Sequence, residues 1–292
     1  MSRFLRHFRK ALWKSLEHDV VNTAKATAYS GMLMLFPTLV VATTLLALVP
    51  EGTSLVGEVR SAFEQALPAD SMSLLQSAME TRRIHSTQLI GSALSLSVFA
   101  GLGVMLSLME GFRRAYRLPR DDWGFWERRV RALLLVPIVL VPLALATLVL
   151  VFGRQIEHWM VENADHELRH MVLLFWRFVR WLVALVTSVA VLGALYHFGT
   201  RRKEHWAWVG PGALTATLVW FPATLAFGWY VTRVADYSMF YGSFGAGIAT
   251  LVWLYITAFS VLLGAELNGV LYRVRQTEAG REPTADPDDA IL

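Results

Sequence analysis

The chain has 292 residues, of which 55% are hydrophobic and 17% are charged, and its formal net charge is +4. A soluble domain usually carries about 25% charged residues. Here the apolar residues form runs long enough to cross a bilayer, which excludes a soluble globular protein. The chain has no cysteine, which excludes disulfides and thiolate chemistry. The basic residues flank the apolar runs, so membrane topology explains them better than nucleic-acid binding.

The first predicted element is an amphipathic helix over residues 3–20. Helical geometry, with about 100° between successive residues, separates an apolar face from a basic face. The apolar face holds Phe4, Leu5, Phe8, Ala11, Leu12 and Leu16, and the basic face holds Arg3, Arg6, Arg9, Lys10 and Lys14. A helix of this kind lies in the plane of the lipid headgroups and is attracted by anionic lipids. We expect it to anchor the topology of the protein.

Six apolar runs then predict six membrane-spanning helices, and hence an all-α, polytopic membrane protein. They cover about residues 27–49, 88–109, 131–152, 178–198, 209–231 and 244–266. An even number of spans places both termini on one side of the membrane. That side holds 19 of the 27 arginine and lysine residues, so the positive-inside rule predicts cytoplasmic termini.

The connections between the spans carry further expectations. Residues 51–87 have apolar residues at helical spacing on either side of Pro68, and they predict a helical hairpin over the outer face. Residues 153–177 predict one more amphipathic helix on that side. We expect residues 1–275 to form a single membrane domain and the polar residues 276–292 to form a disordered cytoplasmic tail.

Two of the predicted spans contain a central proline, Pro37 in the first and Pro222 in the fifth. A proline inside a helix removes one backbone hydrogen bond and kinks the helix. In a membrane the freed carbonyl group needs a neighbour or a water molecule. The two prolines therefore indicate either hinges beside a cavity or ordinary helix packing.

Polar residues gather at the predicted cytoplasmic ends of three spans. Lys25 begins the first span, Glu110 and Arg113 end the second, and Glu266 and Asn268 end the sixth. Because these ends lie at a similar depth, we expect Lys25, Glu110, Arg113 and Glu266 to form a cluster. Ionisable residues at a membrane boundary pair with each other or face water. The cluster is either a gate or a site for a headgroup or a proton, or its members only cap the helix ends.

The outer entrance of the last span is rich in acidic, aromatic and glycine residues. It contains Asp236, Tyr241, Gly242 and Gly245. The tyrosine and the acid indicate either an interfacial aromatic belt or the outer mouth of a pathway. The glycines lie four residues before Ala246 and Ala249, a spacing that lets membrane helices pack closely.

Residues 166–170 match the H-E-x-x-H pattern of zinc metallopeptidases, in which two histidines bind zinc and the glutamate activates water. No acid or histidine follows as a third ligand before His197, and no cleft-forming domain is present. A zinc peptidase built on His166, Glu167 and His170 is therefore a remote alternative. We expect no enzymatic activity, no metal and no cofactor.

Three passages of the chain resemble the YihY/BrkB family of bacterial inner-membrane proteins, once mislabelled as ribonuclease BN. They are residues 19–37, with an Ala-Tyr pair that ends at Tyr29 and a Phe-Pro pair that ends at Pro37, residues 206–213 (WAWVGPGA), and residues 241–268. The resemblance implies an all-helical protein of the bacterial inner membrane. Members of this family are connected with serum resistance and with export of lipid or lipopolysaccharide precursors.

The leading hypothesis is a transporter or flippase for a lipid or another amphiphile. Charged residues at the inner ends of the spans would hold an anionic headgroup while the tails stay in the bilayer. The candidate residues are Lys25, Tyr29, Pro37, Glu110, Arg113, Pro222, Asp236, Tyr241, Gly242, Gly245, Glu266 and Asn268. The alternative is a scaffold of an envelope complex that transports nothing. We expect membrane lipids as partners and no nucleic acid, and a homo-oligomer is left open.

Overall fold

The computed structural model describes residues 2–47, 87–118, 123–163, 169–201, 205–233 and 245–278. Within these ranges every regular element is a helix, which confirms the predicted all-α class for the described part of the chain. The helices are α1 (Ser2–Glu17), α2 (Val20–Ala47), α5 (Thr87–Ala115), α6 (Phe125–Asn163), α7 (Arg169–Gly199), α8 (Trp206–Arg233) and α10 (Gly245–Glu278).

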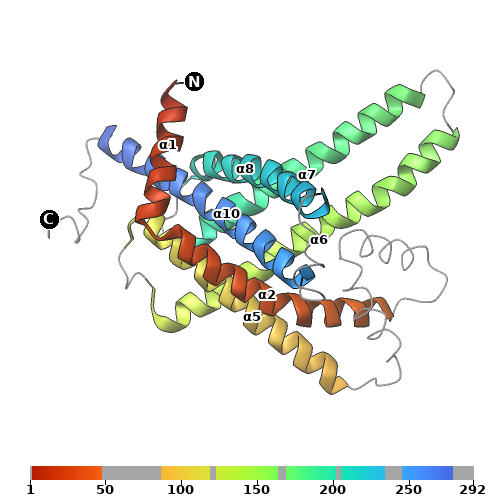
Figure 1. The fold of residues 1–292 in the computed structure, drawn as a ribbon, viewed down its shortest axis with the longest axis horizontal. Helices are drawn as coiled ribbons and strands as arrows, with labels where there is room; N and C mark the ends of the chain where they lie inside the picture. Colours follow the sequence, from red (N-terminus) through yellow and green to blue (C-terminus); the bar gives the residue numbers. More distant parts are fainter. Residues whose placement is uncertain are drawn as a thin grey trace.

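Helix α10 lies at the centre of the bundle. It contacts α1, α2, α5 and α8, and it runs between α8 on one side and the pair α2–α5 on the other (Figure 1). Helices α6 and α7 also run side by side, and α7 contacts α8. Residues 262–270 of α10 are all buried, so this segment forms the core against which the other helices pack.

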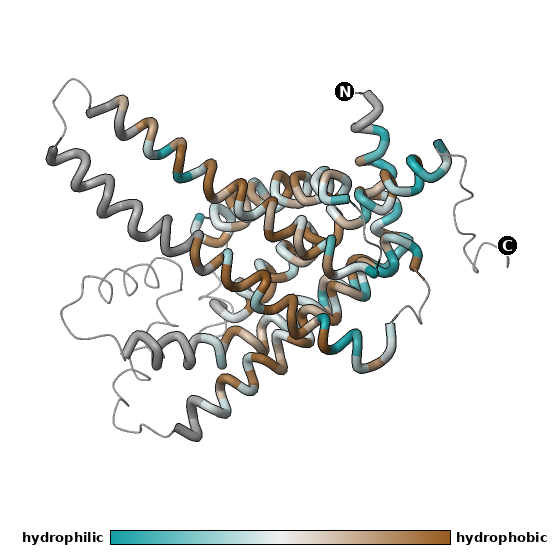
Figure 2. The backbone as a smooth tube through the Cα atoms, turned by 180° about the vertical axis from the view of Figure 1, so that it is seen from behind, coloured by the Kyte–Doolittle hydropathy of each residue, from teal (hydrophilic) through white to brown (hydrophobic). Residues whose placement is uncertain are grey.

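The described helices have the surface of a protein surrounded by lipid. Large apolar side chains are exposed along all of these helices, for example at Phe99 of α5, Trp126 of α6, Phe178 of α7 and Trp229 of α8. Figure 2 shows hydrophobic residues along the middle of the helices and hydrophilic residues at the end of the bundle that holds both termini. A soluble protein rarely exposes apolar surface of this extent.

By length and composition, four of the described helices can cross a membrane. They are Gly91–Ala115, Leu174–Gly199, Trp206–Arg233 and Gly247–Glu278, which correspond to the second, fourth, fifth and sixth predicted spans. Helices α2 and α6 cover the first and third predicted spans and are not among these four. The chain is thus a membrane protein with several apolar helices, and the number of six spans stays a prediction.

Some predicted boundaries are wrong. Helix α10 continues past residue 266 to Glu278, so the expected tail begins too early. Helix α6 continues to Asn163 and α7 begins at Arg169, so residues 153–177 form no separate helix in the described part of the chain. The α10 extension packs against α1, where Ala11 meets Leu267 and Val270, and this contact stabilises the turns beyond the apolar run. The predicted hairpin over residues 51–86 and residues 279–292 lie outside the described residues.

Helix α1 has the predicted amphipathic pattern and ends at Glu17. Ala11 is fully buried and packs with Leu267 and Val270 of α10, whereas Trp13 and Leu16 are exposed. The helix therefore divides its apolar residues between the protein core and the outside. The position of α1 in the headgroup plane stays a prediction.

One basic residue of α1 lies against the bundle. The side chain of Lys14 is 15% exposed, and its Nζ is 3.9 Å from Oε2 of Glu17. Burial, followed by repulsion from Arg117 and Arg273, lowers the pKa of Lys14 below its ordinary value. The basic face predicted for lipid headgroups is thus partly directed at other basic residues of the protein.

Asp19 forms the corner between α1 and α2. Its φ is 58°, a left-handed conformation that aspartate tolerates better than most residues. The N–H of His18 donates to the carbonyl of Lys14 at the end of α1 (2.9 Å), and the N–H of Thr23 donates to the carbonyl of Asp19 at the start of α2 (3.1 Å). The Asp19 carboxylate accepts a hydrogen bond from the Asn22 side chain (2.6 Å).

Neither central proline ends its helix. Helix α2 continues through Pro37, which is buried, and α8 continues through Pro222, which is exposed. The ring of Pro222 therefore does not lie within a helix interface. The interpretation of both prolines as hinges stays a prediction.

Candidate functional site

A network of charges surrounds Glu110 near the end of α5. The Glu110 carboxylate accepts hydrogen bonds from Arg113 (2.6 and 3.1 Å), Arg114 (3.2 Å) and Arg128 of α6 (3.0 Å). Arg114 also donates to the Asp19 carboxylate (3.3 Å). Three guanidinium groups thus share two carboxylates, which leaves one excess positive charge. Charge-assisted bonds of this kind are stronger than neutral ones and fix the helix ends relative to one another.

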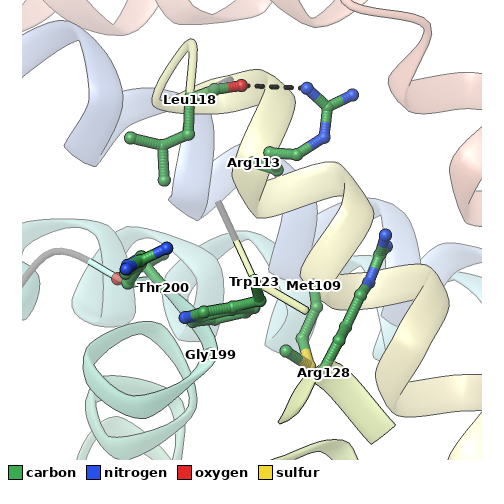
Figure 3. A pocket seen from close by; sticks show the side chains of 8 residues that line it. Met109, Arg113, Leu118, Trp123, Arg128, Gly199 and Thr200 are labelled. Atoms are coloured by element: carbon green, nitrogen blue, oxygen red, sulfur yellow. Dashed lines mark hydrogen bonds between the residues drawn. The ribbon is translucent and has the colours of Figure 1, made fainter. Parts of the chain in front are cut away.

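Arg113 also closes the end of α5. The chain reverses at Arg117, whose φ is 52°, and the N–H of Leu118 donates to the carbonyl of Arg113 (2.9 Å) in a Schellman-type ending. The Arg113 side chain in turn donates to the carbonyl of Leu118 (2.9 Å; Figure 3). The residue is therefore a structural cap as well as a partner of Glu110.

A small cavity of about 20 Å³ lies beside this cap. Its lining comes from the ends of three helices and consists of Met109, Arg113, Leu118, Trp123, Arg128, Gly199, Thr200 and Arg201. In Figure 3 the Trp123 ring lies between Thr200 and the two arginines, whose guanidinium groups point away from it. The volume has room for about one water molecule, so this cavity is too small for an amphiphilic substrate.

A wider, open groove lies between α2 and α5 on the other side of Glu110. Its volume is about 350 Å³, and its lining consists of Asp19, Asn22, Thr23, Ala26, Leu106, Ser107, Glu110 and Arg114. The lining combines charged, hydroxyl and apolar side chains. Because α2 begins and α5 ends here, the groove lies near the end of the apolar part of α5.

Two predicted residues lie along the same helix as this groove. Lys25 and Tyr29 of α2 are both exposed, and the Lys25 ammonium donates to the Asn22 side chain (3.3 Å). Asn22, Ala26 and Tyr29 follow each other at helical spacing on one face of α2, which places Tyr29 next along the helix from the groove. Lys25 has no contact with Glu266 among the described residues.

Glu266 has a different partner from the predicted one. Its side chain is fully buried, and both carboxylate oxygens contact Nδ1 of His18 (2.9 and 3.0 Å). His18 lies at the corner after α1, so the pair ties that corner to α10. The expected cluster is therefore divided, with Arg113 and Glu110 in one group, Glu266 in another, and Lys25 bonded to Asn22 of the groove lining.

Asn268 is buried in the contact between α10 and α8. Its Oδ1 accepts a hydrogen bond from the N–H of Gly212 (2.8 Å), and its Nδ2 donates to the carbonyl of Val209 (3.0 Å). These bonds satisfy two backbone groups near Pro211, which has no N–H to donate. Asn268 and Glu266 lie inside a helix that continues to Glu278, and their position at the end of a span stays a prediction.

Helices α8 and α10 approach each other closely at Gly212 and Gly264. A methyl group on Gly264 would lie 2.5 Å from the carbonyl oxygen of Gly212 and 2.5 Å from the Tyr196 hydroxyl, and one on Gly212 would overlap Asn268. The buried Tyr196 hydroxyl donates to the carbonyl of Val261 (2.6 Å). We call Gly212, Gly264, Asn268 and Tyr196 the α8–α10 seam.

The remaining candidates are only partly placed. Gly245 is buried at the start of α10, whereas Asp236, Tyr241 and Gly242 lie outside the described residues. Their proposed roles stay predictions.

The zinc-site alternative is likewise incomplete in the structure. His170 lies in the first turn of α7, and His166 and Glu167 lie outside the described residues. Among the described residues, no group of three or more histidine, cysteine, aspartate or glutamate residues could hold a metal ion. The remote metallopeptidase hypothesis is thus untested at its own residues.

Sequence reasoning missed His18, Arg128 and the seam glycines Gly212 and Gly264. The pairing of Arg128 with Glu110 and of His18 with Glu266 depends on helices far apart in the chain, and nothing local indicates it. The glycines did have a signal. Gly212 lies in WAWVGPGA and Gly264 lies two residues before the buried Glu266, and small residues in apolar runs mark close helix contacts.

Fold and surface together define an integral membrane protein built from apolar helices. The family model for the virulence factor BrkB matches residues 11–289, and the chain belongs to this family. This confirms the resemblance stated from the sequence.

Similar proteins come from several bacteria. The chain is 28% identical over 257 residues to the ribonuclease-like protein YfkH of Bacillus subtilis, covering 88% of this chain and 91% of that one. It is 27% identical over 278 residues to a UPF0761 membrane protein of Chromohalobacter salexigens, covering 94% of this chain and 65% of that one. It is 27% identical over 272 residues to the UPF0761 membrane protein VP0125 of Vibrio parahaemolyticus, covering 90% and 82%.

The chain therefore spans just under two thirds of the Chromohalobacter relative and most of the other two. No solved structure matches this chain.

Proposed function

We propose that the protein is a transporter or flippase that moves a lipid or another amphiphilic envelope component across the membrane. One observation carries this proposal. The open groove of about 350 Å³ between α2 and α5 joins charged side chains to apolar ones at the end of two apolar helices. An amphiphile needs such a place, where the headgroup meets polar groups while the tails stay in lipid.

The charge network beside the groove supports the same function. An ionisable group within or at the end of an apolar helix is unfavourable unless it is paired or faces water. Glu110, Arg113, Arg114 and Arg128 are paired with each other, and the groove gives Glu110 and Arg114 access to the outside. A headgroup that enters the groove would therefore meet a preorganised set of charges.

We also propose that the membrane is the bacterial inner membrane and that both termini are cytoplasmic. The hydrophilic end of the bundle in Figure 2 includes α1, whose residues Arg6, Arg9 and Lys10 are basic, and this supports the orientation. The chain has no cysteine, so single cysteines introduced at Ser2 and Leu292 can be labelled in intact cells. Labelling of either cysteine from the outside by a membrane-impermeant maleimide would contradict the proposed orientation.

Transport is tested with the purified full-length protein in liposomes that contain fluorescent lipids of several headgroup classes. We expect faster movement of label between leaflets than in protein-free liposomes. Ala26 lines the groove, so Ala26→Trp should slow the movement by filling it. Ala226 of α8 is also exposed and is not part of the groove lining, so Ala226→Trp is a matched control.

Two results would overturn the proposal. The first is no movement above protein-free liposomes for any lipid class, and the second is equal slowing by both tryptophan variants. If the first result came with a stoichiometric partner cross-linked to residues 51–87, the scaffold hypothesis would replace the transporter.

A further inference from the structure

We infer that the groove between α2 and α5 binds the phosphate of a lipid headgroup, with Arg114 as its main ligand and Lys25 and Ser107 beside it. The role of this binding in transport rests on the proposed function. The binding itself does not, because a lipid can bind without moving between leaflets. The ligand class is a phosphodiester that carries acyl chains.

Arg114 has the free donor that such a ligand needs. Its Nε donates to Glu110 (3.2 Å) and its Nη1 donates to Asp19 (3.3 Å). The second terminal nitrogen, Nη2, has no hydrogen-bond partner among the described residues. The side chain is 36% exposed and lines the groove. A guanidinium held in this way by two carboxylates presents its remaining donors in a fixed direction, which suits a phosphate group.

The charge balance favours an anion over a cation. Asp19 and Glu110 offset two of the three arginines of the network, so one positive charge is left. Lys25 is exposed on the same helix as Asn22, which lines the groove, and it contributes a second positive charge held by a single 3.3 Å bond. A phosphodiester, with one negative charge, would reduce this excess at a place where low polarity strengthens the attraction.

The acceptors that a cation would need are already occupied. Both oxygens of the Glu110 carboxylate receive arginine donors, and the two oxygens of Asp19 receive Asn22 and Arg114. Ser107 adds a hydroxyl group that lines the groove. The lining itself holds two carboxylates and one guanidinium, and because donors already occupy both carboxylates, the Nη2 of Arg114 is the donor that a phosphate would meet.

The surroundings of the groove favour a lipid over a free phosphate ion. Ala26 and Leu106 form the apolar part of its lining, and Tyr29 and Leu33 continue the same face of α2 with 63% and 50% of their surface exposed. Acyl chains attached to the bound phosphate would lie along these residues. A free phosphate ion would gain nothing from this apolar path.

The experiment measures lipid binding to the purified full-length protein by native mass spectrometry. The probes are phosphatidylglycerol, diacylglycerol of the same chain length, and inorganic phosphate. We expect phosphatidylglycerol to bind more tightly than diacylglycerol. Arg114→Gln should reduce its affinity by roughly tenfold, as expected for loss of a charge-assisted hydrogen bond. Arg131 is an exposed arginine paired with Glu127 on α6, so Arg131→Gln should leave the affinity unchanged.

If Arg114→Gln does not fold, Lys25→Gln provides the same test, because Lys25 is exposed and only weakly bonded. Equal affinity for phosphatidylglycerol and diacylglycerol would overturn the inference. So would an equal loss of affinity in Arg131→Gln, or competition by inorganic phosphate at the same concentration as the lipid. Tight binding without transport would refute the proposed function alone, and transport that does not depend on Arg114 or Lys25 would refute this inference alone.

Discussion

The α8–α10 seam and the groove between α2 and α5 are both places where polar groups meet inside an apolar bundle, but they differ in every physical respect. At the seam, Asn268 pairs with two backbone groups and Gly212 lies against Gly264, with no space between the helices. In the groove, the lining is open, and the Nη2 of Arg114 has no hydrogen-bond partner among the described residues. The seam is closed to a ligand, and the groove can admit one.

Helix α10 shows why this difference matters for assigning function. Its polar residues Glu266 and Asn268 are both buried and both bonded within the protein. A polar residue in an apolar helix is thus not by itself a sign of a substrate pathway. Two kinds of polar side chain should be distinguished. In one kind, all hydrogen-bonding atoms have partners within the protein, whereas in the other kind, such as Arg114, one donor atom remains available to a ligand.

The largest expected effect comes from breaking the closest contact of the seam. Gly212→Ala would place a methyl group against the carbonyl of Gly264 and the Asn268 side chain, so the helices must separate. Overpacking of this kind costs about 1–3 kcal/mol, and we expect a clear fall in the melting temperature of the purified protein.

Gly210→Ala is the matched control, because nothing lies within 4 Å of a methyl group there. It should be neutral or slightly stabilising, since alanine favours a helix by up to about 1 kcal/mol over glycine. Equal melting temperatures for the two variants would show that the seam is not tightly packed.

A comparable effect is expected when the hydrogen bonds of the seam are removed by a side chain with the same branching and the same number of heavy atoms. Asn268→Leu would leave the N–H of Gly212 and the carbonyl of Val209 buried without these partners. An unsatisfied buried group costs about 1–3 kcal/mol. Asn268→Asp keeps the acceptor for Gly212 and loses only the donor to Val209. The melting temperature should be highest for the wild type, lower for Asn268→Asp and lowest for Asn268→Leu, provided that the new aspartate carries no charge. A series of melting curves at different pH values would identify an effect of that charge.

The two regions also mark how much could be predicted from the sequence. The all-α class followed from the apolar runs, and the described part of each run lies within a helix, α2, α5, α6, α7, α8 or α10. The contact between Glu110 and Arg113 followed from their spacing on one helix. The local pattern carried this information because neighbours three or four residues apart meet on a helix surface.

The rest depended on contacts between distant helices. The sequence suggested that Glu266 ends a span, because the apolar run stops there, yet α10 continues to Glu278 with α1 packed against it. The carboxylate of Glu266 therefore meets His18, not Lys25. Packing determines which helix contacts each face of α10. Because nearly every residue of the run is apolar, the hydrophobic pattern does not distinguish these faces.

The smallest effect in this series concerns the charge network beside the groove. Glu110→Gln removes the carboxylate that holds Arg113, Arg114 and Arg128, and three guanidinium groups would then repel each other. Because the network is partly exposed, we expect a loss of about 1 kcal/mol or somewhat more. Glu127→Gln breaks an exposed pair with Arg131 one turn away on α6 and should cost less than about 0.5 kcal/mol. Both losses are measured as shifts in thermal unfolding.

Glu110→Gln also separates the role of the groove from that of the α8–α10 seam. If the groove is a binding site, Glu110→Gln should remove a negative charge from its lining and free the Nε of Arg114, and should therefore raise the affinity for phosphatidylglycerol while it lowers stability. The seam variants Asn268→Leu and Gly212→Ala should lower stability and leave the affinity of the remaining folded protein unchanged. A loss of lipid affinity in the seam variants at full folding, or no change of affinity in Glu110→Gln, would mean that the contrast between a closed seam and an open groove does not describe how this protein works.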